Sequence, residues 1–185
     1  MDVREAQADV RSAYRGGFAG PLVSALIWFL AAAAYRWASP GVGTVILFLG
    51  GMLIFPLSAL VLKILGSPSS LPKGHPSNAL AMQSAFTVPL GLLVAIALGS
   101  FQPDLFFPAS LIIVGAHYLT FISLYGMWLY GALAGSLVAI GAASIFLLPG
   151  LRAFSGWIGA LVFLAFTTPL YLTYRASVNS EPTVP

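Results

Sequence analysis

Six long apolar stretches dominate this chain, and each is long enough to cross a lipid bilayer. A bilayer core about 30 Å thick requires about 20 apolar residues of α-helix, and helix is expected because lipid offers no partners to unpaired backbone groups. The sequence therefore predicts an all-α fold, a polytopic bundle of six transmembrane helices. The predicted helices cover residues 17–35, 43–65, 79–100, 107–125, 127–148 and 154–175.

The shortage of charged residues points to the same class of protein. Only 7% of the residues are charged and 59% are hydrophobic, whereas a soluble domain has about 25% charged residues. The lipid bilayer is therefore the expected partner of most of the surface. The basic residues are spread along the chain without a basic run, so membrane topology explains the positive net charge better than nucleic-acid binding does.

The division between the fourth and fifth predicted helices rests on one glycine. A single helix over residues 107–148 would be about 63 Å long at 1.5 Å rise per residue, which is roughly twice the thickness of the bilayer core. Two helices in a tight hairpin, with the break at Gly126 in the sequence LYGMW, fit the bilayer better.

The distribution of basic residues predicts the orientation. Six helices place both termini on one side, and cytoplasmic segments carry the excess of Lys and Arg. Both termini and the loop 66–78 are therefore predicted to be cytoplasmic, in the inner (plasma) membrane of a bacterium. The terminal side carries Arg4, Arg11, Arg15, Lys63, Lys73 and Arg175, and the other side carries Arg36 and Arg152.

The segments outside the helices are predicted to be short tails. Residues 1–16 form a cytoplasmic N-terminal tail, and residues 176–185 form a C-terminal tail. At 100° per residue the arginines of the first tail share one face, which predicts a short helix on the membrane surface, with a frayed tail as the alternative. The charged start, without a small-residue cleavage site after a short apolar stretch, predicts that the first helix is retained rather than cleaved as a signal peptide.

His117 is the clearest candidate for a functional side chain, because it lies midway along the fourth predicted helix. Ionisable groups inside a bilayer are expensive and are candidates for function by default. One interpretation is an imidazole that accepts protons or binds a ligand, and the other is a neutral imidazole hydrogen-bonded to a neighbouring helix. The polar residues expected to face the bundle interior are His117, Gln83, Ser84, Thr87 and Thr120.

The residue types that the helices lack restrict the chemistry. All five acids, Asp2, Glu5, Asp9, Asp104 and Glu181, fall outside the predicted helices. Two histidines without nearby acids cannot supply a three-ligand metal site, and the chain has no cysteine. Neither a nucleophile motif nor a glycine-rich phosphate loop is present. These absences predict no metal and no cofactor, assign no catalytic residue, and favour a function that is not enzymatic.

Two further features concern lipid contact and helix packing. Lys63 ends the second predicted helix, where its long stem can reach the interface or contact an anionic lipid head group. Gly131 and Gly135 form a GxxxG pattern in GALAG. Such a pattern lets two helices approach closely, either within one chain or between protomers.

Three segments together resemble a known family. They are GGMLIFPLSALVLKILG, NALAMQSAFTVPLGLL and IIVGAHYLTFISLYGMWLY. They are similar to an uncharacterised family of small bacterial six-span membrane proteins, the domain-of-unknown-function family seven-zero-one-zero. The resemblance implies the six-helix fold and draws attention to His117, but it implies no reaction. The matching residues are Pro56, Leu57, Ser58, Asn78, Gly115, Ala116, His117, Leu124 and Tyr125.

Three functional hypotheses remain open from the sequence. The first is a non-enzymatic integral membrane protein that is transporter-like, channel-like or an accessory subunit. The second is an intramembrane enzyme that acts on a lipid and uses His117 as acid or base. The third is a structural partner of a larger membrane complex, packed through the GALAG face. A homo-oligomer or a membrane-protein partner is compatible with each hypothesis, and a nucleic acid is not expected.

Overall fold

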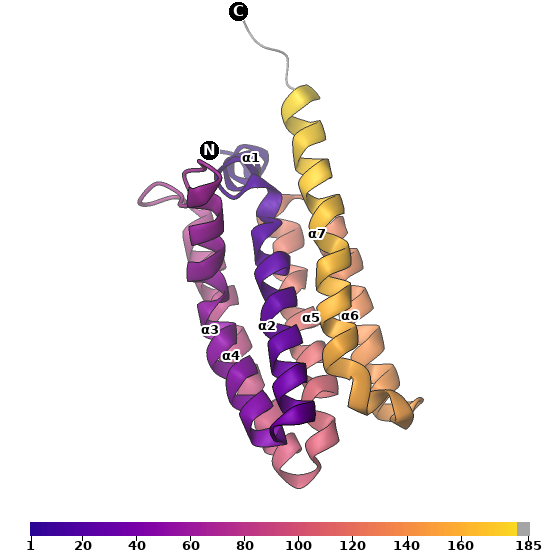
Figure 1. The fold of residues 1–185 in the computed structure, drawn as a ribbon. Coiled ribbons are helices and arrows are strands. Elements are labelled where there is room, and N and C mark those ends of the chain that lie inside the picture. Colours follow the sequence, from indigo (N-terminus) through magenta and orange to yellow (C-terminus); the bar gives the residue numbers. More distant parts are fainter. Residues whose placement is uncertain (181–185) are drawn as a thin grey trace, which may run out of the picture.

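The computed structural model describes residues 1–180 and contains helices but no strand within that range. Its long helices run side by side as one bundle (Figure 1). Three short 3₁₀ turns interrupt the connections: η1 (Arg15–Gly17), η2 (Pro103–Leu105) and η3 (Pro149–Phe154). The helices are α1 (Val3–Ala13), α2 (Ala19–Trp37), α3 (Pro40–Ile64), α4 (Ser77–Phe101), α5 (Phe106–Tyr125), α6 (Leu129–Phe146) and α7 (Ser155–Ser180).

Six of these helices are long and apolar enough to cross a membrane, which confirms the predicted fold class. The break predicted at Gly126 is present: α5 ends at Tyr125, and Gly126 has φ 63° and ψ 28°. This left-handed conformation favours glycine because a Cβ atom would clash with the backbone. The chain therefore reverses at Gly126 and begins α6 three residues later (Figure 1).

The ends of the helices differ by a few residues from the predicted ones. The sixth predicted helix begins at residue 154, and α7 begins at Ser155 after the turn η3. Of the predicted C-terminal tail 176–185, residues 176–180 continue α7. Residues 181–185 lie outside the described part of the chain.

A core of aromatic side chains lies between helices α2, α5, α6 and α7. Trp28 of α2 lies against Phe107 and Phe163, with ring centroids 5.8 and 5.6 Å apart. Tyr130 of α6 is fully buried and stacks on Tyr118 at 6.0 Å. By contrast, α3 and α4 expose long apolar faces, which suits contact with lipid.

The closest approach of the α5 and α6 backbones occurs at glycines outside the predicted pair. A Cβ atom added at Gly115 would lie 3.0 Å from the carbonyl oxygen of Ala134, and one at Gly141 would lie 2.6 Å from that of Pro108. Gly135 has open space around the position of a Cβ atom. Within the GALAG pattern, Gly131 packs against α5, where an added Cβ atom would lie 3.1 Å from Cδ1 of Ile122, whereas Gly135 faces outward from the bundle.

Candidate functional site

Helix α1 lies across one end of the bundle, next to the loop between α3 and α4 (Figure 1). A capping box starts it: the side chain of Asp2 accepts a hydrogen bond from the Glu5 amide at 2.9 Å, and Glu5 accepts one from the Asp2 amide at 2.8 Å. Val10 and Ala13, on the inner face of α1, are buried. Residues 3–13 are thus a docked helix, and we call residues 1–17 the N-terminal strap.

Two arginines of the N-terminal strap bind the carboxyl ends of long helices. Arg11 donates from Nη1 to the carbonyl oxygen of Tyr125 at 2.7 Å, at the end of α5. Arg15 donates from Nη2 to the carbonyl oxygen of Leu65 at 2.6 Å, just after α3. The last carbonyls of a helix have no partners within it, and a cation there also complements the helix dipole. The strap therefore ties α5 to α3, a role that the sequence analysis did not assign to these arginines.

The second histidine, His75 in the loop between α3 and α4, is buried against the strap. Its side chain is 1% exposed, and its Nε2 atom lies 3.4 Å from Oδ2 of Asp9 without forming a hydrogen bond. Its Nδ1 atom accepts a hydrogen bond from the Ser77 amide at 3.2 Å, at the start of α4.

Burial raises the pKa of the Tyr14 hydroxyl above its ordinary value of 10.0, and a hydrogen bond with the Leu71 backbone opposes that rise. Tyr14 is therefore neutral at physiological pH.

Within the bundle, His117 forms a polar cluster with Ser84 and Thr120. Nδ1 of His117 lies 2.9 Å from Oγ of Ser84 on α4. That oxygen lies 2.6 Å from Oγ1 of Thr120, which in turn lies 2.6 Å from the carbonyl oxygen of His117. Ser84, one of the polar residues predicted to face the bundle interior, is thus the partner of His117, and the cluster joins α4 to α5.

The direction of these hydrogen bonds follows from counting protons. A carbonyl oxygen has no proton, so Thr120 donates its single hydroxyl proton to the His117 carbonyl. Thr120 then accepts from Ser84, whose single proton is used in that bond. Ser84 in turn accepts from Nδ1–H of His117. Each hydroxyl has one proton and two acceptor lone pairs, so the neutral imidazole carries its proton on Nδ1 and a free lone pair on Nε2.

The Nε2 atom therefore offers a free lone pair that can accept a hydrogen bond. It has no hydrogen-bond partner among the described residues, and it is not among the fully enclosed unpaired atoms there. The rings of Tyr118 and Phe121 flank the imidazole with centroids 5.4 and 4.8 Å away. Because Nδ1 donates to Ser84, His117 is not placed as a base for the Ser84 hydroxyl.

The remaining predicted site residues lie outside this cluster. Gln83 and Thr87 are exposed on α4 rather than buried in the bundle. Thr87 donates to the Ser84 carbonyl at 2.7 Å, whereas Gln83 has no hydrogen-bond partner among the described residues. The helical period explains the exposure of Gln83, which is turned about 100° from Ser84, whereas Thr87 lies on the same face as Ser84 but one turn further along α4. Lys63 is exposed in the last turn of α3.

Two cavities and the titratable groups complete the description of the site. The cavities measure about 150 and 290 Å³ and lie near opposite ends of the bundle, and His117 lines neither of them. Across residues 1–180, the structure has no group of three His, Asp or Glu side chains arranged to hold a metal ion. The sequence analysis did not identify the smaller cavity, which Arg36 and Asp104 both line.

The six apolar helices around a packed aromatic core define a polytopic α-helical membrane protein. Within that class, the chain belongs to the family described as Family of unknown function (DUF7010), whose match covers residues 3–173. This confirms the resemblance seen in the sequence, and the match extends over the N-terminal strap as well as the bundle. No curated protein and no solved structure matches the chain.

Proposed function

We propose that this chain is a non-enzymatic accessory subunit of a bacterial inner-membrane assembly. In this proposal, the polar groups on α4 and α5, Gln83 and Nε2 of His117, bind a transmembrane helix that carries amide or hydroxyl side chains. The helix belongs to another membrane protein or to a second copy of this chain. Polar side chains of this kind hold helices together in a bilayer, where lipid cannot satisfy them.

The observation that carries the proposal is the unpaired amide of Gln83. Its Cα lies about 9 Å along α4 from the first residue of that helix, at 1.5 Å per residue, and the side chain is exposed within the predicted membrane span. An amide that loses water without gaining a partner costs about 1–3 kcal/mol. A partner helix would remove that cost and would also use the lone pair on Nε2 of His117.

The other sequence hypotheses receive less support from the geometry. A lipid-acting enzyme with a Ser84–His117 dyad needs an imidazole that accepts the serine proton, but here Nδ1 donates to Ser84. A transporter or channel needs a polar path, yet His117 lines neither of the two cavities described above. The structural partner that packs on the GALAG face is the second candidate, because the open space at Gly135 leaves room for another helix.

Site-specific photocrosslinking in native membranes tests the accessory-subunit proposal. Phe86, which is 62% exposed on α4 near Gln83, is replaced by the photoreactive aromatic benzoylphenylalanine. Phe55, which is 65% exposed on α3, provides the matched control position. We expect a discrete protein adduct from position 86, with the mass of a dimer or of a complex with another membrane protein, and none from position 55.

A second variant tests whether that adduct depends on the side-chain amide of Gln83. Gln83→Leu in the chain with the photoreactive residue at position 86 should abolish the protein adduct, because the partner loses its hydrogen bond. Lipid adducts alone at position 86, or a protein adduct that is unchanged by Gln83→Leu, would refute the proposal.

We also propose that both termini are cytoplasmic, and single cysteines can test this in a chain that has none of its own. Ser70→Cys lies in the exposed loop between α3 and α4, and Gln102→Cys lies at the opposite end of the bundle. A membrane-impermeant maleimide should label Gln102→Cys in intact spheroplasts and label Ser70→Cys only after permeabilisation. The reverse pattern would show that the orientation is inverted.

A further inference from the structure

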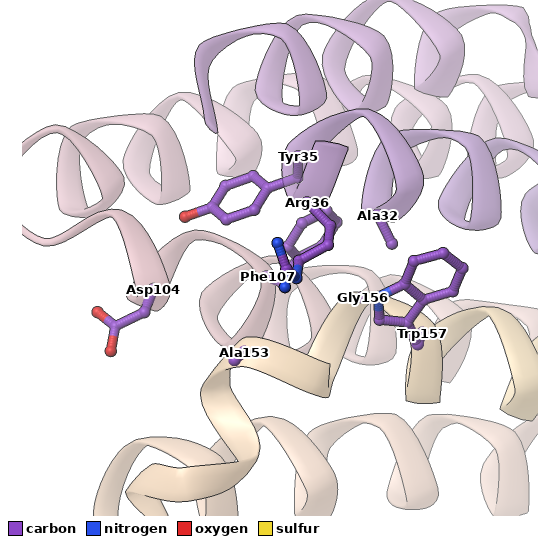
Figure 2. A pocket seen from close by; sticks show the side chains of 8 residues that line it. All are labelled: Ala32, Tyr35, Arg36, Asp104, Phe107, Ala153, Gly156 and Trp157. Carbon is purple, nitrogen blue, oxygen red and sulfur yellow. The ribbon is translucent and has the colours of Figure 1, made fainter. Parts of the chain in front are cut away.

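A cavity of about 150 Å³ lies at the end of the bundle opposite α1, between the end of α2 and the start of α7. Figure 2 shows Arg36 and Trp157 on its walls, with Phe107 behind them and Tyr35 pointing toward Asp104. Ligand pockets for drug-sized molecules measure about 300–1,000 Å³. This cavity is therefore suited to a smaller group, such as the head group of a lipid.

The cavity carries one cation and one anion that do not pair with each other. Arg36 is exposed and forms no ion pair or hydrogen bond with any described residue. Asp104 lies 3.7 Å from Nη1 of Arg152 and is still 44% exposed. Arg152 is 18% exposed and also donates to the carbonyl oxygens of Ser144 and Ile145. Its single long contact leaves the exposed part of the Asp104 carboxylate open to a ligand. Two opposite charges on one cavity, held apart, match a ligand that carries both charges.

Aromatic side chains place this cavity at the level of the membrane interface. Trp157 contacts Trp37 and Phe29, with ring centroids 5.5 and 5.0 Å apart. Tryptophan and tyrosine gather where hydrocarbon meets the lipid head groups. The faces of aromatic rings also attract ammonium groups, and Tyr35 and Trp157 both line the cavity.

We propose that this cavity binds the zwitterionic head group of a phospholipid that carries a phosphate and a primary ammonium group, the phosphoethanolamine class. Arg36 binds the phosphate, because a guanidinium matches the geometry of phosphate oxygens. Asp104 and the ring of Tyr35 bind the ammonium group. The acyl chains lie along the apolar surface of the bundle. The site is separate from the polar face of α4 and α5 and does not depend on the function proposed for that face.

Native mass spectrometry of the full chain in mild detergent tests the proposal, with phosphatidylethanolamine and phosphatidylglycerol supplied in equal amounts. We expect the chain to retain phosphatidylethanolamine in preference to phosphatidylglycerol. Arg36→Gln should weaken that retention about tenfold, because it removes a charged hydrogen-bond donor. Asp104→Asn should abolish the preference between the two lipids, because only the ammonium group distinguishes them at this carboxylate.

Arg4→Gln is the matched control, because Arg4 is an exposed arginine at the opposite end of the molecule. It should leave lipid retention unchanged, and thermal unfolding without added lipid checks that each variant is folded. Equal retention of both lipids by the unaltered chain, or undiminished retention by Arg36→Gln, would overturn the proposal. Competition by free phosphoethanolamine as strong as that of the lipid would overturn the assignment to a membrane lipid.

Discussion

Replacing Gly115 with valine is expected to destabilise the bundle by about 3 kcal/mol, the upper range for overpacking a filled interior. A Cβ atom at this position would lie 3.0 Å from both the Ala134 carbonyl oxygen and the Val138 amide nitrogen. Both atoms belong to the backbone of α6, so neither can move aside without displacing the helix. The added methyl groups of valine then force α5 and α6 apart along much of their length.

Gly135→Val provides the matched control for this experiment, because it makes the same chemical change on a helix of the same hairpin. Its Cβ atom would have no neighbour within 4 Å, so the expected change in stability is within about 0.5 kcal/mol. The free energy of unfolding of each variant can be measured in mixed micelles against a titration of denaturing detergent. Equal losses for the two variants, or no loss for Gly115→Val, would contradict the packing described here.

The number and type of the helices could be predicted from the sequence, because the bilayer sets one dominant rule for helix length and apolarity. The hairpin at Gly126 could be predicted for the same reason, since one uninterrupted helix would be too long for the bilayer. The sequence also places His117 and Ser84 among the few polar side chains expected inside the bundle. Their pairing could be anticipated because buried polar side chains in adjacent helices tend to find each other.

The contacts between distant segments could not be read from the sequence. The GxxxG pattern at Gly131 and Gly135 indicates that one face of the helix carries small residues. It does not indicate whether that face points into the bundle or outward. In the sequence, Arg11 indicates only the orientation of the chain in the membrane. Its hydrogen bond to the Tyr125 carbonyl oxygen depends on where α1 packs against the bundle. Likewise, Arg36 and Asp104 line one cavity only because the fold brings η2 and the end of α2 to the same end of the bundle.

Ser84→Ala is expected to destabilise the bundle by about 1 kcal/mol, which is typical of a hydrogen bond between membrane helices. The change removes the oxygen that accepts from His117 Nδ1 and the proton that Thr120 accepts, so two groups lose partners. Ser136→Ala is the matched control, because the Ser136 hydroxyl only bonds to the Ala132 carbonyl within its own helix at 2.8 Å. It should have a smaller effect in the same unfolding assay, and a loss equal to that of Ser84→Ala would argue against a special role for the cluster.

The second consequence of Ser84→Ala concerns the proton of His117. In the unaltered chain the Ser84 oxygen holds the imidazole proton on Nδ1, and this leaves Nε2 as the acceptor offered to a partner. Without that oxygen the preference for Nδ1–H is lost. The proton should then redistribute toward Nε2, which is the ordinary position when no neighbour selects the tautomer.

The ¹⁵N chemical shifts of the His117 imidazole test the proposed site most directly. The chain contains two histidines, so labelled histidine gives two imidazole signals, and His75→Gln assigns the one from His117. The hydrogen-bond chain through Ser84 and Thr120 predicts a protonated Nδ1 and an unprotonated Nε2 in the neutral imidazole. A proton on Nε2 in the unaltered chain would contradict it, because Nε2 would then not be the acceptor that the proposed partner requires.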